Sequence, residues 1–388
     1  MTLPLIVCGS ALLFSLKYQK NEIFKILSIN FGIFLSLIGI IFSALNLITL
    51  TREKEPLITH QGDYSRGGNW LQSNKSQGLG YSYPPNLKDF SSTKVARQAD
   101  FSKEILYDVT YNIDYLGNRQ TPYYKDDVLN KNNSILFLGD SLTFGEGLND
   151  DQTLSFFIQN ELGRSTLNAG MHGYGAHQAL RLLEDDDLFK KRTKGHKIKT
   201  IIYRSIVDHI NRTAGYSPWD LYGPCYELND SKTVSYKGSF VECGKRDNSF
   251  LKKILKRLAS TSEPLTKRFF ERFTAKYGSK NYPPEDVDRF VAVVSRMNSI
   301  AKSKGINFFV VLEDVEIHDE LCGQKVPFAY ELERRLKQEG LNLILTSNVY
   351  TKRLCESNEL TISKYDRHPT MVANKLLSTY IINNKLIQ

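Results

Sequence analysis

The chain has 388 residues, of which 41% are hydrophobic, and this suffices for one large core with an appendage or for two modest domains. Lys and Arg outnumber Asp and Glu by 51 to 42, and the formal charge of +9 favours contact with anionic surfaces such as lipid headgroups or acidic polymers. The sequence has no zinc-finger spacing, no aromatic RNA-binding signature and no long basic block, so nucleic acid is not an expected partner.

The first fifty residues predict a membrane anchor. Residues 26–50 carry no charged side chain, and as a helix they would reach about 37 Å, more than the ~30 Å hydrocarbon layer. Residues 2–16 are also uncharged but short, and they lack the basic start of a signal peptide. We interpret them as the first helix of a two-helix hairpin, with a single anchor as the alternative. The three lysines between the two segments mark the cytoplasmic side, which places the chain after residue 50 on the extracytoplasmic face.

The five cysteines are compatible with this location. Cys8 lies in an apolar segment, and the other four show no CxxC spacing, which argues against a structural zinc site. An even number of cysteines outside the cytoplasm permits disulfides. The shortest loops are closed by pairing Cys225 with Cys243 and Cys322 with Cys355, and four unpaired thiols are the alternative.

Residues 51–104 are polar, rich in Ser, Gly, Asn and Lys, and contain Pro84-Pro85, so we expect an irregular linker. Residues 105–388 form the predicted main domain, which opens with an alternating strand at 107–116. Further apolar strands are expected at 134–138, 200–203, 306–312 and 341–345. Helical spacing is found at 153–162, 287–304, 328–339 and from about residue 370. This alternation predicts a mainly parallel sheet covered by helices on both faces.

Residues 213–283 interrupt the alternation and are interpreted as an insertion. Within it, residues 250–258 form a basic amphipathic segment. We interpret this segment as a surface helix that packs through its apolar side. A lid over the active site and a membrane-contacting helix are the alternatives.

A serine follows the first apolar strand of the alternating region, in the sequence GDSLTFGEG at residues 139–147. A residue just past the C-terminal end of a parallel strand lies at the edge of the sheet where α/β proteins bind ligands. Glycines there let the backbone turn sharply and approach a substrate. Taken alone, Gly-Asp-Ser is common and also fits a plain turn.

Three segments together resemble the SGNH/GDSL hydrolase family. Residues 139–147 resemble its signature block, residues 167–175 (LNAGMHGYG) its second block, and residues 366–370 (DRHPT) its last block. The resemblance implies a flavodoxin-like, three-layer α/β/α fold. It also implies a serine nucleophile, with an acid and a base from the last block.

Carried onto this sequence, the resemblance assigns Ser141, His368 and Asp366 as catalytic residues. A serine hydroxyl is a weak nucleophile until an imidazole takes its proton, and the imidazole needs a carboxylate to fix its tautomer and stabilise its charge. The backbone N–H groups of Ser141 and Gly173 are the implied oxyanion donors. Only Arg367 separates the acid from the base, where the usual last block has two residues.

The third family block departs further. It normally supplies an asparagine amide to the oxyanion, but counting from the strand at 200–203 puts Asp208 at that position. A carboxylate about 4 Å from the developing charge would oppose it by ~4 kcal/mol, about as much as a donor contributes. Asp208 therefore turns toward Arg204 or Arg212, is protonated, or is replaced at the site by Asn211. We favour Asn211.

The remaining site residues are expected on the substrate side, where we place Asp140, Asp208 and His209 as binding residues. His172 and His177 with Asp208 fit no recurrent ligand spacing, so we expect no metal, and no cofactor motif is present. The 21 tyrosines, together with Trp70 and Trp219, could stack on sugar rings, although most of them will belong to the core or its rim.

Family members cleave or transfer acyl groups on lipids, thioesters and carbohydrates, and neither the fold nor the triad chooses among them. With the expected extracytoplasmic location, the resemblance implies a serine esterase. Its expected partners are an O-acylated, first of all O-acetylated, cell-surface or exported polysaccharide and the membrane lipid around the anchor. An O-acyltransferase with the same residues and a catalytically silent polysaccharide-binding module are the alternatives.

Overall fold

The computed structural model describes residues 33, 56–63, 78–98, 102–125, 128–244, 282–318, 321–355 and 360–387. The chain divides into two units, residues 1–57 with 97–102, and residues 58–96 with 103–388, and the second unit carries the features analysed below. Apart from Ile33, the predicted anchor at residues 1–50 lies outside the described residues, as does the amphipathic segment 250–258. No helix within the described ranges has the length and apolar character that a membrane span requires.

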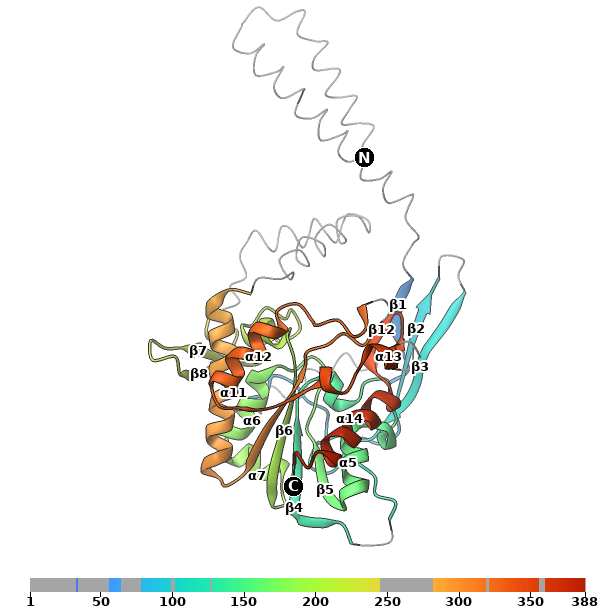
Figure 1. Cartoon of the computed structure of the whole chain (residues 1–388), viewed down its shortest axis with the longest axis horizontal. Coiled ribbons are helices and arrows are strands. Elements are labelled where there is room, and N and C mark those ends of the chain that lie inside the picture. Colours follow the sequence, from blue (N-terminus) through green and yellow to red (C-terminus); the bar gives the residue numbers. More distant parts are fainter. Residues whose placement is uncertain are drawn as a thin grey trace, which may run out of the picture. The chain divides into compact units, whose positions relative to one another are not determined.

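Five parallel strands form the central sheet of the second unit (Figure 1). They are β4 (Asn130–Leu138), β5 (Arg164–Asn168), β6 (Ile198–Ile206), β9 (Asn307–Glu313) and β10 (Asn342–Leu345). In space their order is β10-β9-β6-β4-β5, and in chain order this is the 2-1-3-4-5 arrangement of flavodoxin-like sheets. The order reverses between β4 and β6, which is where such sheets bind their ligands.

Helices cover both faces of the sheet, because successive side chains of each strand point to opposite sides. On β4, Leu136 and Leu138 belong to one hydrophobic core, and Ile135 and Phe137 belong to the other. The first core includes α6 (Ala176–Glu184), α11 (Pro284–Ser303) and α12 (Ala329–Gln338), and the second includes α5 (Leu154–Leu162) and α14 (Met371–Asn383). The predicted three-layer α/β/α arrangement is therefore confirmed for the described part of the chain.

The helices begin and end where the local sequence favours it. Thr153 caps α5 by accepting a hydrogen bond from the backbone of Phe156, and Gly163 ends it in the left-handed region at φ 61°. Thr370 caps α14 in the same way, and Pro284 is the first residue of α11. The shorter helices are α4 (Ser141–Phe144), α7 (Asp186–Arg192), α8 (His209–Thr213), α13 (Lys352–Cys355), and the 3-10 turns η4 (Asp150–Gln152) and η6 (Thr346–Asn348).

The prediction of an irregular linker at residues 51–104 is wrong for much of its described part, at 57–61 and from residue 79 on. A three-stranded sheet in the order β1-β2-β3 is formed by β1 (Leu57–Gln61), β2 (Phe90–Arg97) and β3 (Lys103–Tyr111). Before β2, Leu79, Tyr81 and Tyr83 are at most 2% exposed. The ring of Tyr83 stacks on Phe144 with centroids 5.4 Å apart. Aromatic burial thus orders a segment whose overall composition is that of a loop.

The described part of the insertion, residues 213–244, contains a hairpin of its own. β7 (Pro224–Leu228) pairs antiparallel with β8 (Val234–Ser239). The predicted disulfide between Cys225 and Cys243 is present. Cys322 is also disulfide-bonded, but the side chain of its predicted partner Cys355 lies outside the described part, so that pairing stays a prediction. A second small sheet pairs β11 (Thr361–Ser363) with β12 (Asp366–Pro369).

Candidate active site

Ser141 is the first residue of α4, directly after β4. The turn between the two elements requires glycine, because Gly139 has φ +149° and a Cβ there would overlap Thr143 and lie 2.7 Å from the carbonyl oxygen of Arg204. Asp140 caps α4 by accepting a hydrogen bond from the backbone of Leu142 at 3.0 Å. These local preferences hold the Ser141 hydroxyl at the C-terminal end of β4, beside the reversal of strand order.

The structure brings Ser141, His368 and Asp366 together. Nε2 of His368 lies 2.8 Å from Oγ of Ser141, and Nδ1 lies 2.6 Å from Oδ1 of Asp366. The same carboxylate oxygen accepts the backbone N–H of His368 at 3.0 Å. Asp366 and His368 both belong to β12, where residues two apart share a face, so the single intervening residue Arg367 suffices.

The charges around His368 favour its protonated form. Burial alone would lower the pKa of His368, but the carboxylates of Glu146 and Asp366 raise this pKa above its ordinary value. Burial would likewise raise the pKa of Asp366, but the hydrogen bond and charge of His368, with Lys94, hold it below its ordinary value. The carboxylate is thus kept ionised beside an imidazole that can accept a proton.

Sequence reasoning missed two charged residues of this cluster. Lys94, on β2, places Nζ 2.8 Å from Oδ2 of Asp366 and 3.5 Å from Oε1 of Glu146. The other carboxylate oxygen of Glu146 lies 3.4 Å from Nε2 of His368 and 2.8 Å from Nδ1 of His172. Glu146 lies within the GDSLTFGEG segment, which could have identified it. Lys94 has no such local signal.

The carboxylates of Glu146 and Asp366 and a nitrogen of His368 lie within 4.8 Å of one another, close enough to consider a metal ion. However, the ammonium group of Lys94 bonds to both carboxylates and already supplies a positive charge there. Both ring nitrogens of His368 also have protein partners. The cluster is therefore better described as an internal ion-pair network than as a metal site.

The two histidines weighed as metal ligands have separate partners. His172 bonds Glu146, whereas His177 places Nε2 2.7 Å from Asp220. Asp208 pairs elsewhere, with Arg212 at 3.1 Å. The three residues do not converge on one point.

Asp140 and His209 form a buried set of contacts at the N-terminus of α4. Oδ2 of Asp140 lies 3.0 Å from Nη1 of Arg212 and 3.2 Å from Nε2 of His209, whose Nδ1 lies 2.6 Å from the hydroxyl of Tyr203. Burial would raise the pKa of Asp140, but the hydrogen bond and charge of His209 and the charge of Arg212 hold it below its ordinary value. Asp140 and His209 are 1% and 0% exposed, so the prediction that they contact substrate is wrong.

Asp208 turns toward Arg212, one of the alternatives left open by the sequence, and its side chain is 48% exposed. The side-chain amide of Asn211, the favoured third oxyanion donor, donates to Asp208 at 3.0 Å. Among the described residues, no group accepts a hydrogen bond from the backbone N–H of Ser141 or of Gly173. These two N–H groups are therefore available to a ligand, whereas the Asn211 amide is engaged.

No protein-family model and no curated protein matches this chain. Similar solved structures include one described as a lipolytic protein of the G-D-S-L family from Desulfitobacterium hafniense, at 13% identity and a TM-score of 0.35, covering 67% of this chain and 100% of that chain. A member of the same family from Veillonella parvula has 12% identity and a TM-score of 0.34, covering 65% and 97%. An acetyl xylan esterase from Butyrivibrio proteoclasticus has 9% identity and a TM-score of 0.33, covering 67% and 66%. At these values, the fold assignment rests on the strand order and the two cores rather than on likeness.

Proposed function

We propose that this chain is a serine esterase of the SGNH/GDSL type. One observation carries the proposal: the hydroxyl of Ser141, the imidazole of His368 and the carboxylate of Asp366 form a hydrogen-bonded series at the C-terminal end of β4. This is the arrangement that activates a serine for acyl transfer, and it is recognised by geometry and roles on unrelated folds. The three motif segments of the sequence support the same conclusion.

In the proposed reaction, Oγ of Ser141 attacks the acyl carbonyl carbon while its proton passes to Nε2 of His368. The bond to the leaving alcohol then breaks, and the imidazolium returns the proton to that oxygen. Water attacks the acyl-enzyme with His368 again as the base, which releases the acid and restores the serine. Asp366 stabilises the imidazolium in both steps.

The backbone N–H groups of Ser141 and Gly173 are the proposed donors to the oxyanion. Each such donor is worth about 3 to 4 kcal/mol of transition-state stabilisation. Asn211 can act as a third donor if a bound substrate draws its amide away from Asp208, which lies 3.0 Å from it.

As substrate we propose O-acyl groups, acetyl first, on a cell-surface or exported polysaccharide. The support is the predicted anchor and extracytoplasmic location, together with the disulfide between Cys225 and Cys243, a bond that persists in oxidising compartments. An O-acyltransferase differs only in that a sugar hydroxyl, not water, attacks the acyl-enzyme. The two activities are distinguished by their products in the presence of an added oligosaccharide: an esterase releases the free acid, and an acyltransferase forms an acylated oligosaccharide.

The test uses the full chain purified in detergent, a fluorophosphonate probe and 4-nitrophenyl acetate. Wild type should be labelled and should hydrolyse the ester, and Ser141→Ala should lose labelling and at least about a thousandfold in kcat/KM. The matched control is Ser134→Ala, because Ser134 lies in the middle of β4, the strand that leads to Ser141, and also contacts a histidine, His196, at 3.2 Å. The control should keep both activities.

Two outcomes would contradict the proposal. Labelling that persists in Ser141→Ala would mean that another residue is the nucleophile. A wild-type protein that is folded by circular dichroism yet neither labelled nor active would favour the alternative of a catalytically silent polysaccharide-binding module.

A further inference from the structure

Aromatic side chains of the described part of the insertion extend into solvent. Trp219, Tyr222 and Tyr236 are 50%, 43% and 36% exposed. Single exposed aromatic residues are ordinary, but a group of them in one region marks a surface that binds something. None of the three takes part in the proposed reaction.

Tyr222 and Tyr236 line a groove of about 510 Å³ between the β7–β8 hairpin and the helices α6 and α7, which we name the aromatic groove. Its volume is that of a small-molecule or oligomer site. The other side chains that line it are polar or charged, except for Leu188 among the described residues: Arg181, Asp185, Asp187, Lys191, Ser239 and Glu242. An apolar occupant would remove water from these polar groups without offering them hydrogen bonds, which is costly, so the lining disfavours a lipid chain.

A sugar chain fits this combination of groups. A sugar ring has an apolar face of C–H groups and a rim of hydroxyls, so it suits aromatic rings flanked by charged hydrogen-bonding groups. In the groove, the guanidinium of Arg181 lies 4.2 Å from the ring centroid of Tyr236 and also donates to Asp185 at 2.7 Å. Aromatic and charged groups are thus held side by side.

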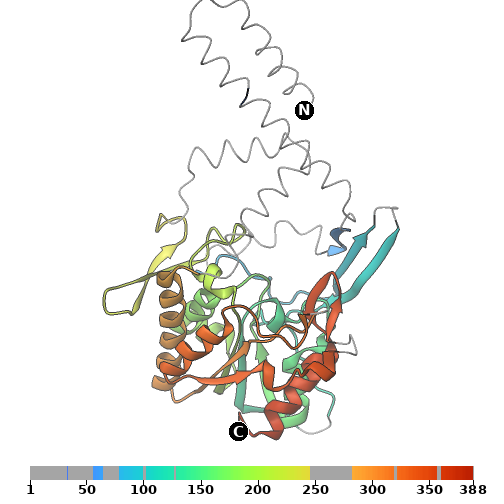
Figure 2. The same cartoon turned by 45° about the horizontal axis from the view of Figure 1, so that its top comes forward.

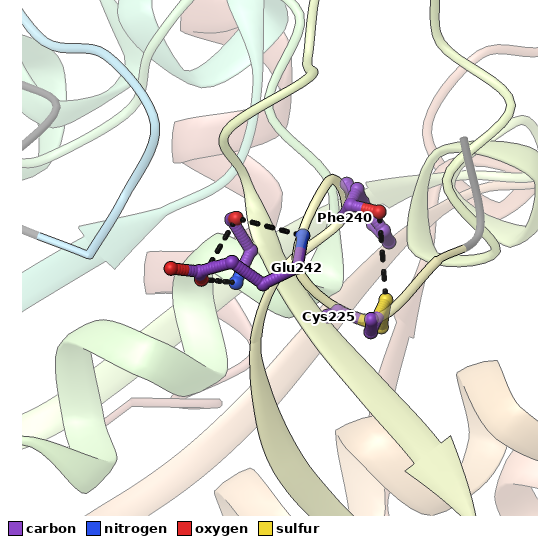
Figure 3. The surroundings of a disulfide bond; sticks show 5 residues. Cys225, Phe240 and Glu242 are labelled. Carbon is purple, nitrogen blue, oxygen red and sulfur yellow. Dashed lines mark hydrogen bonds between the residues drawn. A yellow bond between two sulfur atoms is a disulfide. The ribbon is translucent and has the colours of Figure 1, made fainter. Parts of the chain in front are cut away.

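The hairpin side of the groove is fixed before any ligand binds. The disulfide from Cys225 closes the hairpin, and Glu242 accepts hydrogen bonds from the backbone N–H and hydroxyl of Ser239 at 2.6 and 2.8 Å (Figure 3). The hydroxyl of Tyr226 donates to Glu184 at 2.9 Å and so joins β7 to α6. A preformed groove loses little conformational entropy on binding.

Helix α6 begins just after Gly173, the proposed oxyanion donor, and carries Arg181, which lines the aromatic groove. The indole of Trp219 donates to the carbonyl of Gly173 at 3.2 Å, and Asp220 lies 2.7 Å from His177 in the first turn of α6. From His177 to Asp185 at the end of α6 the helix rises about 12 Å. The chain from Trp219 to Tyr222 therefore leads from the proposed oxyanion donor to the groove. The hairpin is the yellow-green ribbon beside the orange helix α11 in Figure 2.

We propose that the aromatic groove binds the glycan chain of the substrate, some sugar units away from the ester that Ser141 cleaves. This inference rests on the proposed function for the position of the ester. The insertion thus recognises the carbohydrate chain, whereas the three motif segments act on the acyl group.

The experiment compares the full-length wild type in detergent with a Tyr222→Ala/Tyr236→Ala variant. Binding is measured by affinity electrophoresis in gels containing O-acetylated xylan, O-acetylated glucomannan or O-acetylated alginate, each beside its alkali-deacetylated form. Wild type should bind at least one chain, acetylated or not, and the variant should bind it at least about tenfold more weakly. The KM on that acetylated chain should rise, while kcat/KM on 4-nitrophenyl acetate stays within about twofold.

Tyr330→Ala is the matched control, because Tyr330 is 70% exposed but lies on α12. It should bind as wild type does. Equal binding by wild type and the double variant overturns the inference, and so does binding to none of the glycans with ester turnover intact. Loss of binding to anionic phospholipid vesicles, but not to glycans, in the double variant would assign the groove to a membrane surface. If wild type binds glycan but hydrolyses no ester, the proposed reaction fails while the groove assignment stands.

Discussion

The imidazole of His368 lies between charges of opposite sign. Glu146 places a carboxylate oxygen 3.4 Å from Nε2, and the ammonium group of Lys94 bonds to both Glu146 and Asp366. The negative charges raise the pKa of His368, and the positive charge of Lys94 lowers it. Because a general base must be unprotonated to act, this balance sets the lowest pH at which the proposed enzyme works.

Removal of the positive charge should move that limit upward. In Lys94→Met, the pKa of His368 is expected to rise further above its ordinary value, because the two nearby carboxylates are no longer offset. The acidic limb of kcat/KM for 4-nitrophenyl acetate should shift to higher pH, with roughly tenfold lower activity near neutrality. Lys94→Arg retains the charge and should keep the wild-type profile more closely.

Removal of a negative charge at Glu146 should have the opposite effect. Glu146→Gln takes away the leading contribution that raises the pKa of His368, so the acidic limb should move to lower pH. Since the two variants remove charges of opposite sign, a shift of both profiles in the same direction would refute this account. Unchanged profiles in both would show that neither charge acts on the base.

At the level of elements, α4 depends on interactions from α8. Asp140 caps α4 and bonds to His209 and Arg212. The side chains of Asp140 and His209 are buried, and that of Arg212 is nearly so. The pKa of Asp140 is held below its ordinary value, so its contribution to stability is present above the unfolded pKa of about 3.9 and is lost as the pH falls toward the folded value.

Asp140→Asn should therefore lower the free energy of unfolding by about 2 to 4 kcal/mol at pH 7, because the charge of Arg212 loses its buried partner. The difference from wild type should shrink below about pH 4. Urea unfolding at several pH values measures this. Asp230→Asn, at an exposed residue, is the control and should differ from wild type by less than about 0.5 kcal/mol. Equal effects of the two variants would contradict the role assigned to Asp140.

Strands were predicted correctly where an uninterrupted run of apolar residues in the sequence indicates a buried strand. The apolar runs at 134–138, 200–203 and 306–312 fall in β4, β6 and β9, because parallel strands buried on both faces are nearly continuously apolar. β5 escaped prediction because its sequence, RSTLN, is mostly polar. Its polar side chains are satisfied by tertiary contacts; the hydroxyl of Thr166, for example, donates to the side-chain oxygen of Gln159 at 3.3 Å.

In the candidate site, residues carried by short sequence motifs could be predicted, and residues placed by tertiary packing could not. Ser141, His368 and Asp366 could be predicted, because short motifs carry them. Lys94 could not be predicted, because its position beside Asp366 depends on how β2 packs. The sequence of β2 contains no motif that would mark this lysine as a site residue. The burial of His209 also depends on tertiary contacts, since it is held by Asp140 and Tyr203.

For the whole molecule, two features predict the compartment of the main domain: the membrane anchor expected at residues 1–50 and the disulfide between Cys225 and Cys243. The bond between Cys225 and Cys243 would not persist in a reducing cytoplasm, and the three lysines between the predicted helices favour a cytoplasmic loop followed by an extracytoplasmic domain. Both arguments predict the same side for the candidate active site.

Fusions to alkaline phosphatase, which is active only outside the cytoplasm, test this prediction. A fusion after residue 55, before β1, should be active, and a fusion after residue 20, between the two predicted helices, should be inactive. A tag placed before residue 1 distinguishes the two models of the anchor. In a two-helix hairpin the tag lies outside and is cut by a membrane-impermeant protease, whereas with a single anchor it lies in the cytoplasm and is protected. Inactivity of the fusion after residue 55 would put the domain in the cytoplasm. An exported polysaccharide could then no longer be its substrate, whatever Ser141 does to a soluble ester.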